Sequence, residues 1–389
     1  MQNAFPVDEA YMRRALALAK EGLGAASPNP MVGCVIVCRN RIIGEGFHHR
    51  CGEAHAEVNA INAVLNECAA TRGLMRETGR DARTLLQEST LYVTLEPCAH
   101  YGKTPPCAEK IVEMKIPRVV VSCADPNPKV NGGGIAILKA AGVEVVEHVL
   151  EKEGRELGRR FFLNMERKRP YVILKWAQTA DGLITDRKGR PYAITGPLLN
   201  ALNHAYRAQE DAIMVGTDTL LSDNPMLNAR RYAASRQPLR ISLDLHGRIL
   251  DFLRQDAAES PAARIPLHFL DGTQPSLLFV REENVQDYAP WKENVEVVGV
   301  PATVPPLDRL SFYLQVLHER HIGSLIVEGG AELLQSFITQ NLWDEARVFS
   351  SPKTLGTGYA APHLPAVKTV ENREYAGEWV HVFKPVDRR

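Results

Sequence analysis

The protein has 389 residues, 46 basic and 46 acidic side chains, and a net charge of zero, which argues against strong generic attraction to nucleic acid or membranes. This length predicts two domains, since single cores seldom grow beyond about 250–300 residues. No apolar run reaches the roughly 20 residues that span a bilayer, and the amino terminus lacks the plan of a signal peptide, so a cytoplasmic location is expected.

Strands and helices are expected to alternate along the first part of the chain. Asp8 is expected to cap the first helix, in which apolar residues repeat at helical spacing. The further predicted elements are two strands in 31–47 around a turn at Arg39-Asn40, a helix in 55–69, a strand in 89–98 running into a new element at Pro97, a helix at 107–114, a strand at 118–123, a helix at 136–141 and a strand at 142–148. This order predicts a largely parallel or mixed sheet with helices on its faces.

A second α/β core is expected after a charged linker. Residues 151–169 are predicted to be helical until Pro170 ends the helix, and they separate a domain at 1–150 from one at 170–389. Short apolar runs bounded by turn residues then predict strands at 171–177, 211–216, 239–245, 276–280 and 324–330. The stretch 251–275 gives little indication of its structure.

One His-x-Glu and two Pro-Cys pairs indicate a catalytic zinc site. Zinc prefers four tetrahedral N and S ligands, and His55, Cys98 and Cys107 would leave the fourth position open to water. A proline before each cysteine suits the first turn of a helix, where the dipole favours a thiolate. Zinc lowers the pKa of a water molecule, and Glu57 would move the protons as general acid and base. Zinc deaminases use this set of residues.

Other interpretations of these residues stay open at this point. A lone His-x-Glu is mostly a solvated helix start, and a structural zinc site would need a fourth ligand, for which Cys51 is conceivable. Eight residues separate Cys98 from Cys107, whereas the usual deaminase motif is Pro-Cys-x-x-Cys. The remaining cysteines are expected to fill the core: Cys34, Cys38, Cys68 and Cys123.

Longer motifs resemble those of a known family. They are Pro28-Asn29-Pro30-Met31-Val32-Gly33, His55-Ala56-Glu57-Val58, TLEPCAHYGKTPPCAEKI, and Asp125-Pro126-Asn127-Pro128 followed by the run Gly132–Gly134. With the continuing similarity of the second half, they resemble the bifunctional riboflavin-biosynthesis deaminase/reductase family over nearly the whole chain. The long loop between the two cysteines is that family's version of the motif.

The resemblance implies a fold and two reactions. The fold would be a cytidine-deaminase-like α/β/α domain followed by a dihydrofolate-reductase-like α/β domain. The first reaction would remove the 2-amino group of 2,5-diamino-6-(5-phosphoribosylamino)pyrimidin-4(3H)-one, with one zinc ion per chain. The second would reduce the ribosyl chain of 5-amino-6-(5-phosphoribosylamino)uracil to ribityl with NADPH. The partner would be this small phosphorylated pyrimidine, with no nucleic acid or membrane, and a homodimer is expected.

The resemblance also assigns residues. In the deaminase site, the expected substrate-binding residues are Asn29, His48, His100, Lys103 and Asn127, with Lys103 as the cation for the phosphate. In the reductase site, the nicotinamide nucleotide would contact Ala177, Ala193, Thr219, Asp223 and Gly330, and the substrate would contact Pro191, Arg207, Leu227, Arg230 and Glu328. Lys175 and Asp181 would flank the same cleft. The strand 324–328 leads through Gly329-Gly330 into a helix start that can take a phosphate.

The chain departs from the family's pattern in the reductase half. Pro191 stands where a polar residue is usual, Ala193 stands where a tryptophan is usual, and Leu245-His246 replaces a more usual serine. These departures leave open a zinc-stabilised scaffold whose second domain does not turn over. A deaminase of another base, such as tRNA adenine, is a further alternative, against which the near-neutral pI weighs.

Overall fold

The structure, a computed structural model, describes residues 5–101, 105–127, 130–186, 192–258 and 267–386. The chain divides into two compact units, Met1–Arg167 and Lys168–Arg389. Two residues with assigned roles, Lys103 and Pro191, lie outside the described residues. The charged segment 151–169, expected as a linker, forms two helices that belong to the first unit up to Arg167.

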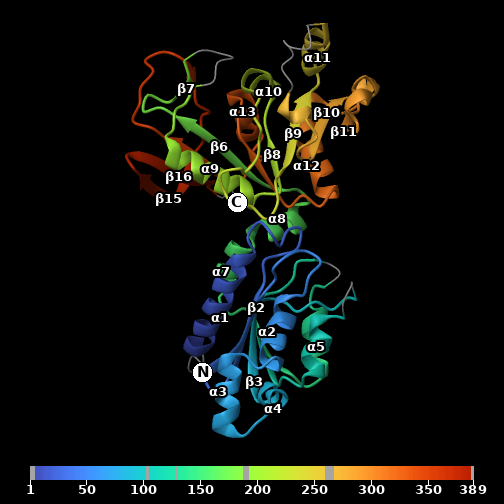
Figure 1. Ribbon diagram of the computed structural model, residues 1–389, viewed down its shortest axis with the longest axis vertical. Helices are drawn as coiled ribbons and strands as arrows, with labels where there is room; N and C mark the ends of the chain where they lie inside the picture. The colour runs from blue at the N-terminus through green and yellow to red at the C-terminus, as the bar shows by residue number, and fades with distance from the viewer. Residues whose placement is uncertain (1–4, 102–104, 128–129, 187–191, 259–266, 387–389) are drawn as a thin grey trace. The chain divides into compact units, whose positions relative to one another are not determined.

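Helices and strands alternate in the first unit (Figure 1). Its strands are β1 (Gly33–Cys38), β2 (Arg41–Phe47), β3 (Ser89–Leu95), β4 (Arg118–Cys123) and β5 (Glu144–Val146). Its helices are α1 (Phe5–Ala19), the 3₁₀ helix η1 (Lys20–Gly22), α2 (Ala56–Leu65), α3 (Ala69–Thr78), α4 (Ala82–Gln87), α5 (Cys107–Glu113), α6 (Gly133–Ala140), α7 (Glu151–Leu157) and α8 (Arg159–Arg167). The predicted turn at Arg39-Asn40 is confirmed, and both residues have the positive φ that a tight hairpin requires.

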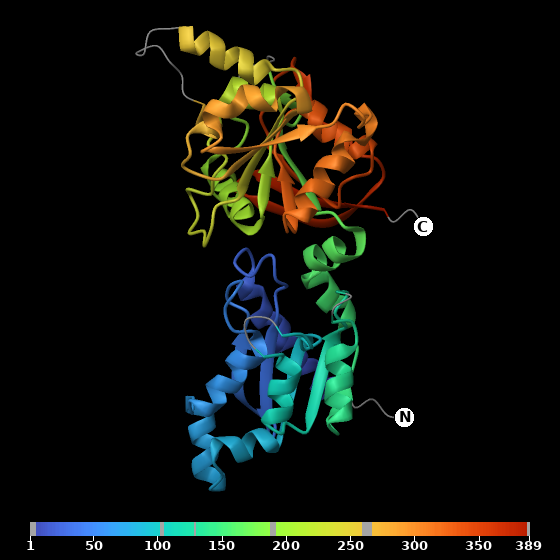
Figure 2. The same ribbon diagram turned by 90° about the vertical axis from the view of Figure 1, so that its right-hand side faces the viewer.

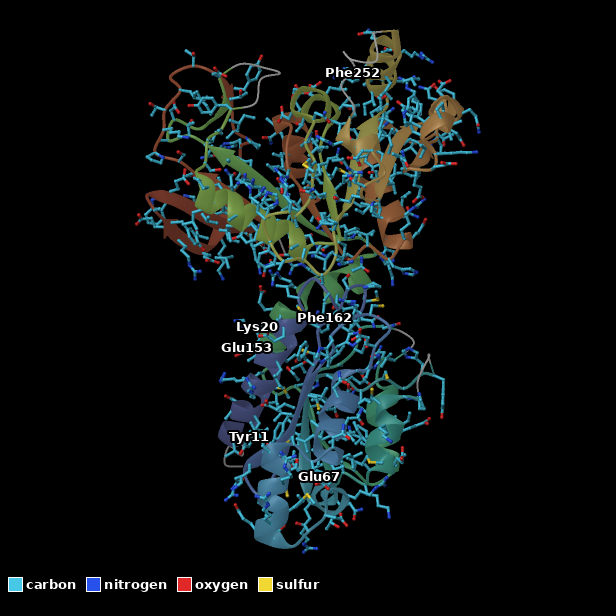
Figure 3. The ribbon with its side chains drawn as sticks, in the orientation of Figure 1. Tyr11, Lys20, Glu67, Glu153, Phe162 and Phe252 are labelled. Carbon is cyan, nitrogen blue, oxygen red and sulfur yellow. The ribbon has the colours of Figure 1, made fainter. Side chains whose placement is uncertain are left out.

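The five strands form one sheet in the order β2-β1-β3-β4-β5. The β1 strand is antiparallel to both neighbours, and β3, β4 and β5 are parallel. Successive residues of a strand point to opposite faces, so Ile36 packs with the α2 side of the sheet and Val35 packs with Met12 of α1. The unit is therefore a three-layer α/β/α sandwich. Phe162 of α8, labelled in Figure 3, packs against Leu95 and Cys123.

The predicted cap at the first helix is wrong. The α1 helix begins at Phe5, and Asp8 lies within it, buried against the sheet. The Asp8 carboxylate accepts hydrogen bonds from the Tyr92 hydroxyl at 2.8 Å and from the Arg118 guanidinium at 3.0 and 2.9 Å. These partners lie on β3 and β4, so tertiary contacts rather than a local cap account for this carboxylate.

The second unit has more strands and a larger sheet. Its strands are β6 (Tyr171–Gln178), β7 (Leu183–Thr185), β8 (Ala212–Met214), β9 (Leu239–Asp244), β10 (Ser276–Arg281), β11 (Val295–Val300), β12 (Ser324–Val327), β13 (Glu345–Ser350), β14 (Tyr359–Ala360), β15 (Val367–Tyr375) and β16 (Glu378–Pro385). Its helices are α9 (Pro197–Gln209), α10 (Thr217–Asp223), α11 (Arg248–Ala258), α12 (Arg309–Glu319) and α13 (Ala331–Thr339), with 3₁₀ helices η2 (His268–Leu270), η3 (Glu282–Trp291) and η4 (Pro306–Asp308). The five predicted strands are confirmed as β6, β8, β9, β10 and β12.

Nine of these strands form one sheet in the order β11-β10-β9-β8-β12-β6-β13-β16-β15. The strands from β11 to β13 are parallel, and β16 and β15 are added antiparallel. Helices α12 and α13 pack on one face through Leu314 and Phe337, and α9 packs on the other through Leu199 (Figure 2). The β12 strand lies at the centre, so the residues that follow it leave the sheet where open α/β sheets bind ligands.

The described residues contain no helix that is both long enough and apolar enough to cross a membrane.

Candidate active sites

Three side chains of the first unit converge on one point. The Nδ1 atom of His55 lies 3.6 Å from Cys98 Sγ and 3.3 Å from Cys107 Sγ, and the ligand atoms of all three residues lie within 4.8 Å of one another. His55 is the residue just before α2, and Cys107 is the first residue of α5. One imidazole and two thiols within this distance match the donor set of a zinc ion that keeps one position open.

Cys98 reaches a helix amino terminus in a way that differs from the prediction. Pro97 does not begin a helix, and Cys98 lies in the loop after β3. Its Sγ accepts a hydrogen bond from the backbone N–H of Cys107 at 3.2 Å, at the first turn of α5. Hydrogen bonds from Cys107 and from His55 lower the pKa of the Cys98 thiol to about 4. The site therefore favours the thiolate that a metal requires.

Glu57 lies beside the three ligands, inside the first turn of α2. Its side chain is only 3% exposed. Burial raises the pKa of this carboxyl to about 7, and the charge on His55 opposes part of that rise. A buried carboxyl next to an open metal position is suited to moving protons between water and a substrate.

His48 and Asn29 form a polar pair next to the ligands. The His48 ring lies edge-on to His55, with 5.3 Å between ring centroids. Its Nδ1 lies 3.2 Å from the carbonyl oxygen of Ala54, which can only accept, so Nδ1 carries the proton. Burial lowers the pKa of His48, and its neutral Nε2 accepts a hydrogen bond from Asn29 Nδ2 at 3.1 Å. The pair is thus held in one orientation at the wall of the site.

The other predicted deaminase residues lie on the loops around the ligands. His100 is exposed, in the loop that follows Cys98. Asn127 lies in the loop after β4, and its backbone N–H donates to Asp125 Oδ1 at 2.8 Å. Burial raises the pKa of Asp125 to about 6, while the hydrogen bond from Asn127 lowers it.

A buried ion-pair cluster marks the second unit. Glu328, just after β12, accepts two hydrogen bonds of 2.8 Å from Nε and Nη2 of Arg207 on α9. Asn203 Nδ2, one helical turn away, donates to Glu328 Oε2 at 3.2 Å. The Nζ of Lys175 on β6 lies 3.8 Å from the same oxygen and above the ring of Phe349. Burial lowers the pKa of Lys175. Of these residues, sequence reasoning missed Asn203, which helical spacing alone did not distinguish, and Phe349, which only the tertiary fold brings to Lys175.

Positive side chains gather near this cluster. Arg230 Nη1 donates to Asn228 Oδ1 at 2.9 Å, and its side chain is exposed. Partial desolvation lowers the pKa of Arg230, and the neighbouring charges of Arg207 and Arg231 lower it further. Like charges held this close would be stabilised by an anion such as a phosphate.

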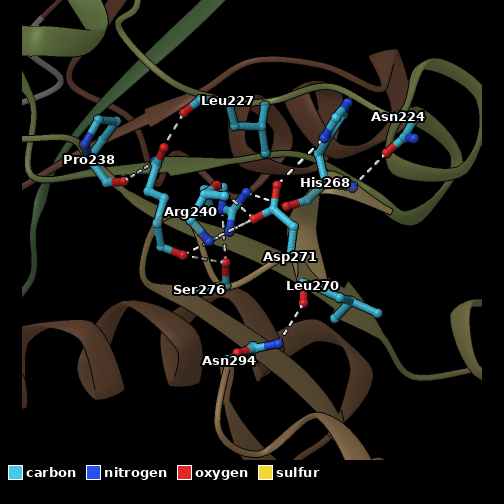
Figure 4. A network of polar contacts seen from close by, with 11 residues as sticks. Asn224, Leu227, Pro238, Arg240, His268, Leu270, Asp271, Ser276 and Asn294 are labelled. Carbon is cyan, nitrogen blue, oxygen red and sulfur yellow. Dashed lines mark hydrogen bonds and ion pairs between the residues drawn. The ribbon is translucent and has the colours of Figure 1, made fainter. Parts of the chain in front are cut away.

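The loop that carries Leu227 is fixed by a buried polar network (Figure 4). Leu227 itself is buried and has a φ of 53°, and its carbonyl oxygen accepts from Gln274 Nε2 at 3.3 Å. Arg240, at 1% exposure, in turn donates to the carbonyl oxygen of Gln274 at 2.7 Å and to Ser276 Oγ at 2.8 Å. At the other end of the network, Asn224 Oδ1 accepts from the His268 backbone N–H at 2.9 Å. Sequence reasoning did not predict this network, because its members are far apart in the chain.

Thr219 and the two glycines after Glu328 lie together. Gly329 and Gly330 have φ of 124° and 62°, and a Cβ at Gly329 would come within 3.2 Å of the Thr219 side chain. Gly330 directly precedes α13, whose first N–H groups have no partner within the helix. The N–H groups of a helix start can bind an anion such as a phosphate. Asp223, the last residue of α10, is exposed and accepts from Ser222.

Two further predicted cofactor residues lie on the other side of the central strand. Ala177 is on β6 and packs on the cluster around Leu199. Ala193 is exposed, and its carbonyl oxygen accepts from Lys353 Nζ at 2.8 Å. Asp181 accepts backbone hydrogen bonds from Leu355 and Gly356 at 3.0 and 2.8 Å, which ties the loop after β13 to the β6–β7 turn. Lys353 was not predicted, because it lies far from Ala193 in the sequence.

Comparisons with known proteins cover both halves of the chain. Residues 6–123 match the family model described as cytidine and deoxycytidylate deaminase zinc-binding region, and residues 170–375 match the RibD C-terminal domain. The riboflavin biosynthesis protein RibD of Aquifex aeolicus is 35% identical over 368 residues, which cover 94% of this chain and 92% of that protein. RibD of Actinobacillus pleuropneumoniae is 39% identical over 347 residues, with 89% and 84% covered.

Solved structures agree with these matches. The crystal structure of a diaminohydroxyphosphoribosylaminopyrimidine deaminase/5-amino-6-(5-phosphoribosylamino)uracil reductase from Thermotoga maritima is 34% identical and superposes with a TM-score of 0.80, covering 99% of this chain and 100% of that chain. A structure of Acinetobacter baumannii RibD is 32% identical, with a TM-score of 0.79 and 98% and 100% covered.

Proposed function

This chain belongs to the family of the riboflavin biosynthesis protein RibD, and we propose that its two reactions take place at the two sites described above. It is a bifunctional enzyme, a zinc-dependent deaminase joined to an NADPH-dependent reductase. The predicted fold class, a cytidine-deaminase-like α/β/α domain followed by a dihydrofolate-reductase-like α/β domain, is confirmed. The deaminase acts on 2,5-diamino-6-(5-phosphoribosylamino)pyrimidin-4(3H)-one, and the reductase converts the ribosyl chain of the product to ribityl.

The convergence of His55, Cys98 and Cys107 around the buried Glu57 carries the deaminase assignment. These three residues would hold zinc, which supplies a Lewis acid that activates water. The carboxylate of Glu57 would take a proton from the attacking water and deliver it to the departing amino group. His48 and Asn29, already bonded to each other, would orient the pyrimidine through their remaining polar groups.

The ribose phosphate would be held by the loops beside the ligands. We assign this role to His100 and Asn127, together with Lys103, which lies outside the described residues. Support comes from the two loops themselves. The loop with His100 begins at the ligand Cys98, and the loop with Asn127 follows the neighbouring parallel strand β4.

For the reductase, the ends of β6 and β12 supply the proposed site. The nucleotide would lie on Gly330 and Thr219 and extend to Asp223, Ala177 and Ala193. Hydride transfer is the chemistry of NADPH, so these residues bind and orient. The substrate would contact Arg207, Leu227, Arg230 and Glu328, with Pro191 outside the described residues. Arg230, whose charge is not neutralised by Glu328, is the better phosphate partner of the two arginines.

A coupled assay with and without a chelator tests both halves. We expect the purified protein to deaminate the phosphorylated diaminopyrimidinone, and a chelator to abolish this step until zinc is restored. With the deaminated substrate, the same protein should oxidise NADPH whether or not the chelator is present. Absence of NADPH oxidation with that substrate would refute the reductase assignment.

We further propose a cytoplasmic homodimer, in keeping with the free cysteines of the described chain. The dimer rests on the family resemblance. Light scattering coupled to size-exclusion chromatography would measure the mass of the assembly, and a mass of one chain would contradict this part.

A further inference from the structure

Glu96 is a buried carboxylate that sequence reasoning passed over. It lies at the end of β3, two residues before Cys98, and is 3% exposed. Its own backbone N–H donates to the carbonyl oxygen of Cys123 at 2.9 Å. The residue is therefore fixed where β3 and β4 end and the two loops of the deaminase site begin.

The Glu96 carboxylate accepts hydrogen bonds from four backbone N–H groups, which belong to residues between Asp125 and Ile135. Oε2 accepts from Asp125 at 3.2 Å and from Gly132 at 3.0 Å. Oε1 accepts from Gly134 at 3.0 Å and from Ile135 at 3.2 Å, both in the first turn of α6. Hydrogen bonds from N–H groups to an ionised carboxylate are stronger than neutral ones, and a helix start favours the negative charge.

Asn127 lies inside the segment that Glu96 holds. Its N–H donates to Asp125 Oδ1, and its carbonyl oxygen accepts from Val130 and Asn131 at 2.8 and 3.0 Å. Gly134 packs so closely on the loop before Cys98 that an added Cβ would lie 1.8 Å from the carbonyl oxygen of Pro97. The α6 start is thus docked directly on the chain that leads to a metal ligand.

We propose that Glu96 is a positioning residue of the deaminase, which fixes the Asn127 segment against the loop bearing Cys98 so that the substrate phosphate is held at a set distance from the metal. This inference rests on the role proposed above for Asn127. The Glu96 carboxylate accepts from backbone N–H groups, so its proposed role is indirect. Its effect should therefore appear in substrate binding rather than in zinc content or in the chemical step.

The test is Glu96→Gln, which keeps the volume of the side chain. An amide has one acceptor oxygen, so its NH₂ must face either the Asp125 and Gly132 pair or the Gly134 and Ile135 pair of donors. We expect the deaminase KM to rise by about tenfold or more, with kcat changed by less than about threefold and zinc still near one per chain. Glu96→Asp, which keeps four acceptor sites, should restore part of the affinity.

Gly134→Ala disrupts the same contact between the start of α6 and the loop before Cys98, without changing Glu96. Its methyl group should push the α6 start away from Pro97 and raise the same KM, so the test stands even if Glu96→Gln fails to fold. The matched control is Asp244→Asn in the second unit. Asp244 is also buried and accepts from three backbone N–H groups at the start of α11, at 2.8 to 3.2 Å. The Asp244→Asn variant should leave the deaminase KM unchanged.

A double-mutant cycle separates this inference from the proposed role of Asn127. If Glu96 acts through Asn127, Glu96→Gln should raise KM by less than about threefold in an Asn127→Ala background. A KM unchanged by Asn127→Ala alone would refute the phosphate role. Three results would each overturn the positioning role. The first is a large rise in KM for Asn127→Ala with no change in KM for Glu96→Gln and Gly134→Ala. The others are fully additive effects of Glu96→Gln and Asn127→Ala on KM, and loss of zinc in Glu96→Gln.

Discussion

Arg207 and Glu328 form a two-pronged ion pair in the second unit, in which two arginine nitrogens each lie 2.8 Å from a carboxylate oxygen. Both side chains are largely buried, at 13% and 7% exposure. A buried pair of this geometry loses much more when one partner is removed than an exposed pair does. The pair therefore fixes Glu328, which the proposed reductase site uses to contact substrate.

Replacing the Arg207 guanidinium with another positively charged group tests this relationship. Arg207→Lys should lower kcat/KM of the reductase by about tenfold or more, because a lysine cannot make two parallel hydrogen bonds to Glu328. NADPH oxidation with the deaminated substrate measures the change, and deamination by the same sample should be unaffected. The control is Arg320→Lys, which changes an exposed pair with Glu296 and should alter neither activity.

The ion pair also predicts a pH dependence of stability. Burial alone would raise the pKa of Glu328, but the charges of Arg207 and Lys175 outweigh it and lower that pKa to about 2, from 4.5. The folded state thus binds this proton more weakly than the unfolded state, and ionised Glu328 contributes roughly 3 kcal/mol above pH 4.5. That contribution should disappear as the pH falls from 4.5 towards 2.

Urea unfolding of the wild type and of Glu328→Gln measures this contribution. The variant should be less stable at pH 7, since it leaves the Arg207 charge buried without its partner. The difference between the two proteins should shrink between pH 5 and pH 3. A difference that stays constant over that interval would contradict the low pKa.

The contact between Lys353 and the carbonyl oxygen of Ala193 predicts a cofactor effect. The backbone at Ala193 has a fixed partner at 2.8 Å, although this side chain is too small for the contacts that the family resemblance leads us to expect there. Lys353→Met should raise the KM for NADPH by roughly threefold to tenfold, as expected for the loss of one charge-assisted hydrogen bond. The exposed Lys368 on β15 provides the control Lys368→Met. Equal KM values in the two variants would mean that this contact has no role in cofactor binding.

The buried guanidinium of Arg240 predicts a stability effect confined to the second unit. Arg240→Met would remove the guanidinium donor from the carbonyl oxygens of His268 and Gln274 and leave them only the longer hydrogen bonds from the Asp271 N–H at 3.4 Å and from Ser276 Oγ at 3.3 Å. This loss should cost roughly 3 kcal/mol. We expect the thermal transition of the second unit to move down while that of the first stays in place. The reductase should also lose affinity for its substrate, because Gln274 holds the Leu227 loop. An unchanged transition temperature would show that the network does not stabilise this unit.

The sequence predicted the parts of the fold that depend on local patterns. Short, nearly continuous apolar runs located β1 and β6, and the pair Arg39-Asn40 located a hairpin turn whose positive φ values are local properties. The α11 helix at Arg248–Ala258 was missed in a stretch with little apolar repetition. Asp8 was taken for a cap because its true partners, Tyr92 and Arg118, are distant in the chain.

In the candidate sites too, residues within local motifs were predicted and residues held by tertiary contacts were not. His55 and Glu57 could be predicted from the sequence, because they belong to one short His-x-Glu motif at a helix start. Glu96, Asn203 and Lys353 could not, because their partners come from strands and loops that only the tertiary fold brings near. Hydrogen bonds to backbone N–H groups leave no recognisable pattern in a sequence, so residues such as Glu96 look like ordinary parts of a motif.

The most direct measurement is the deaminase rate of Glu57→Gln at known zinc content. We predict about one zinc per chain, unchanged NADPH oxidation with the deaminated substrate, and a deamination rate lower by on the order of 10³-fold, as expected for loss of a general acid and base. Deamination within tenfold of the wild-type rate at full zinc content would contradict this prediction.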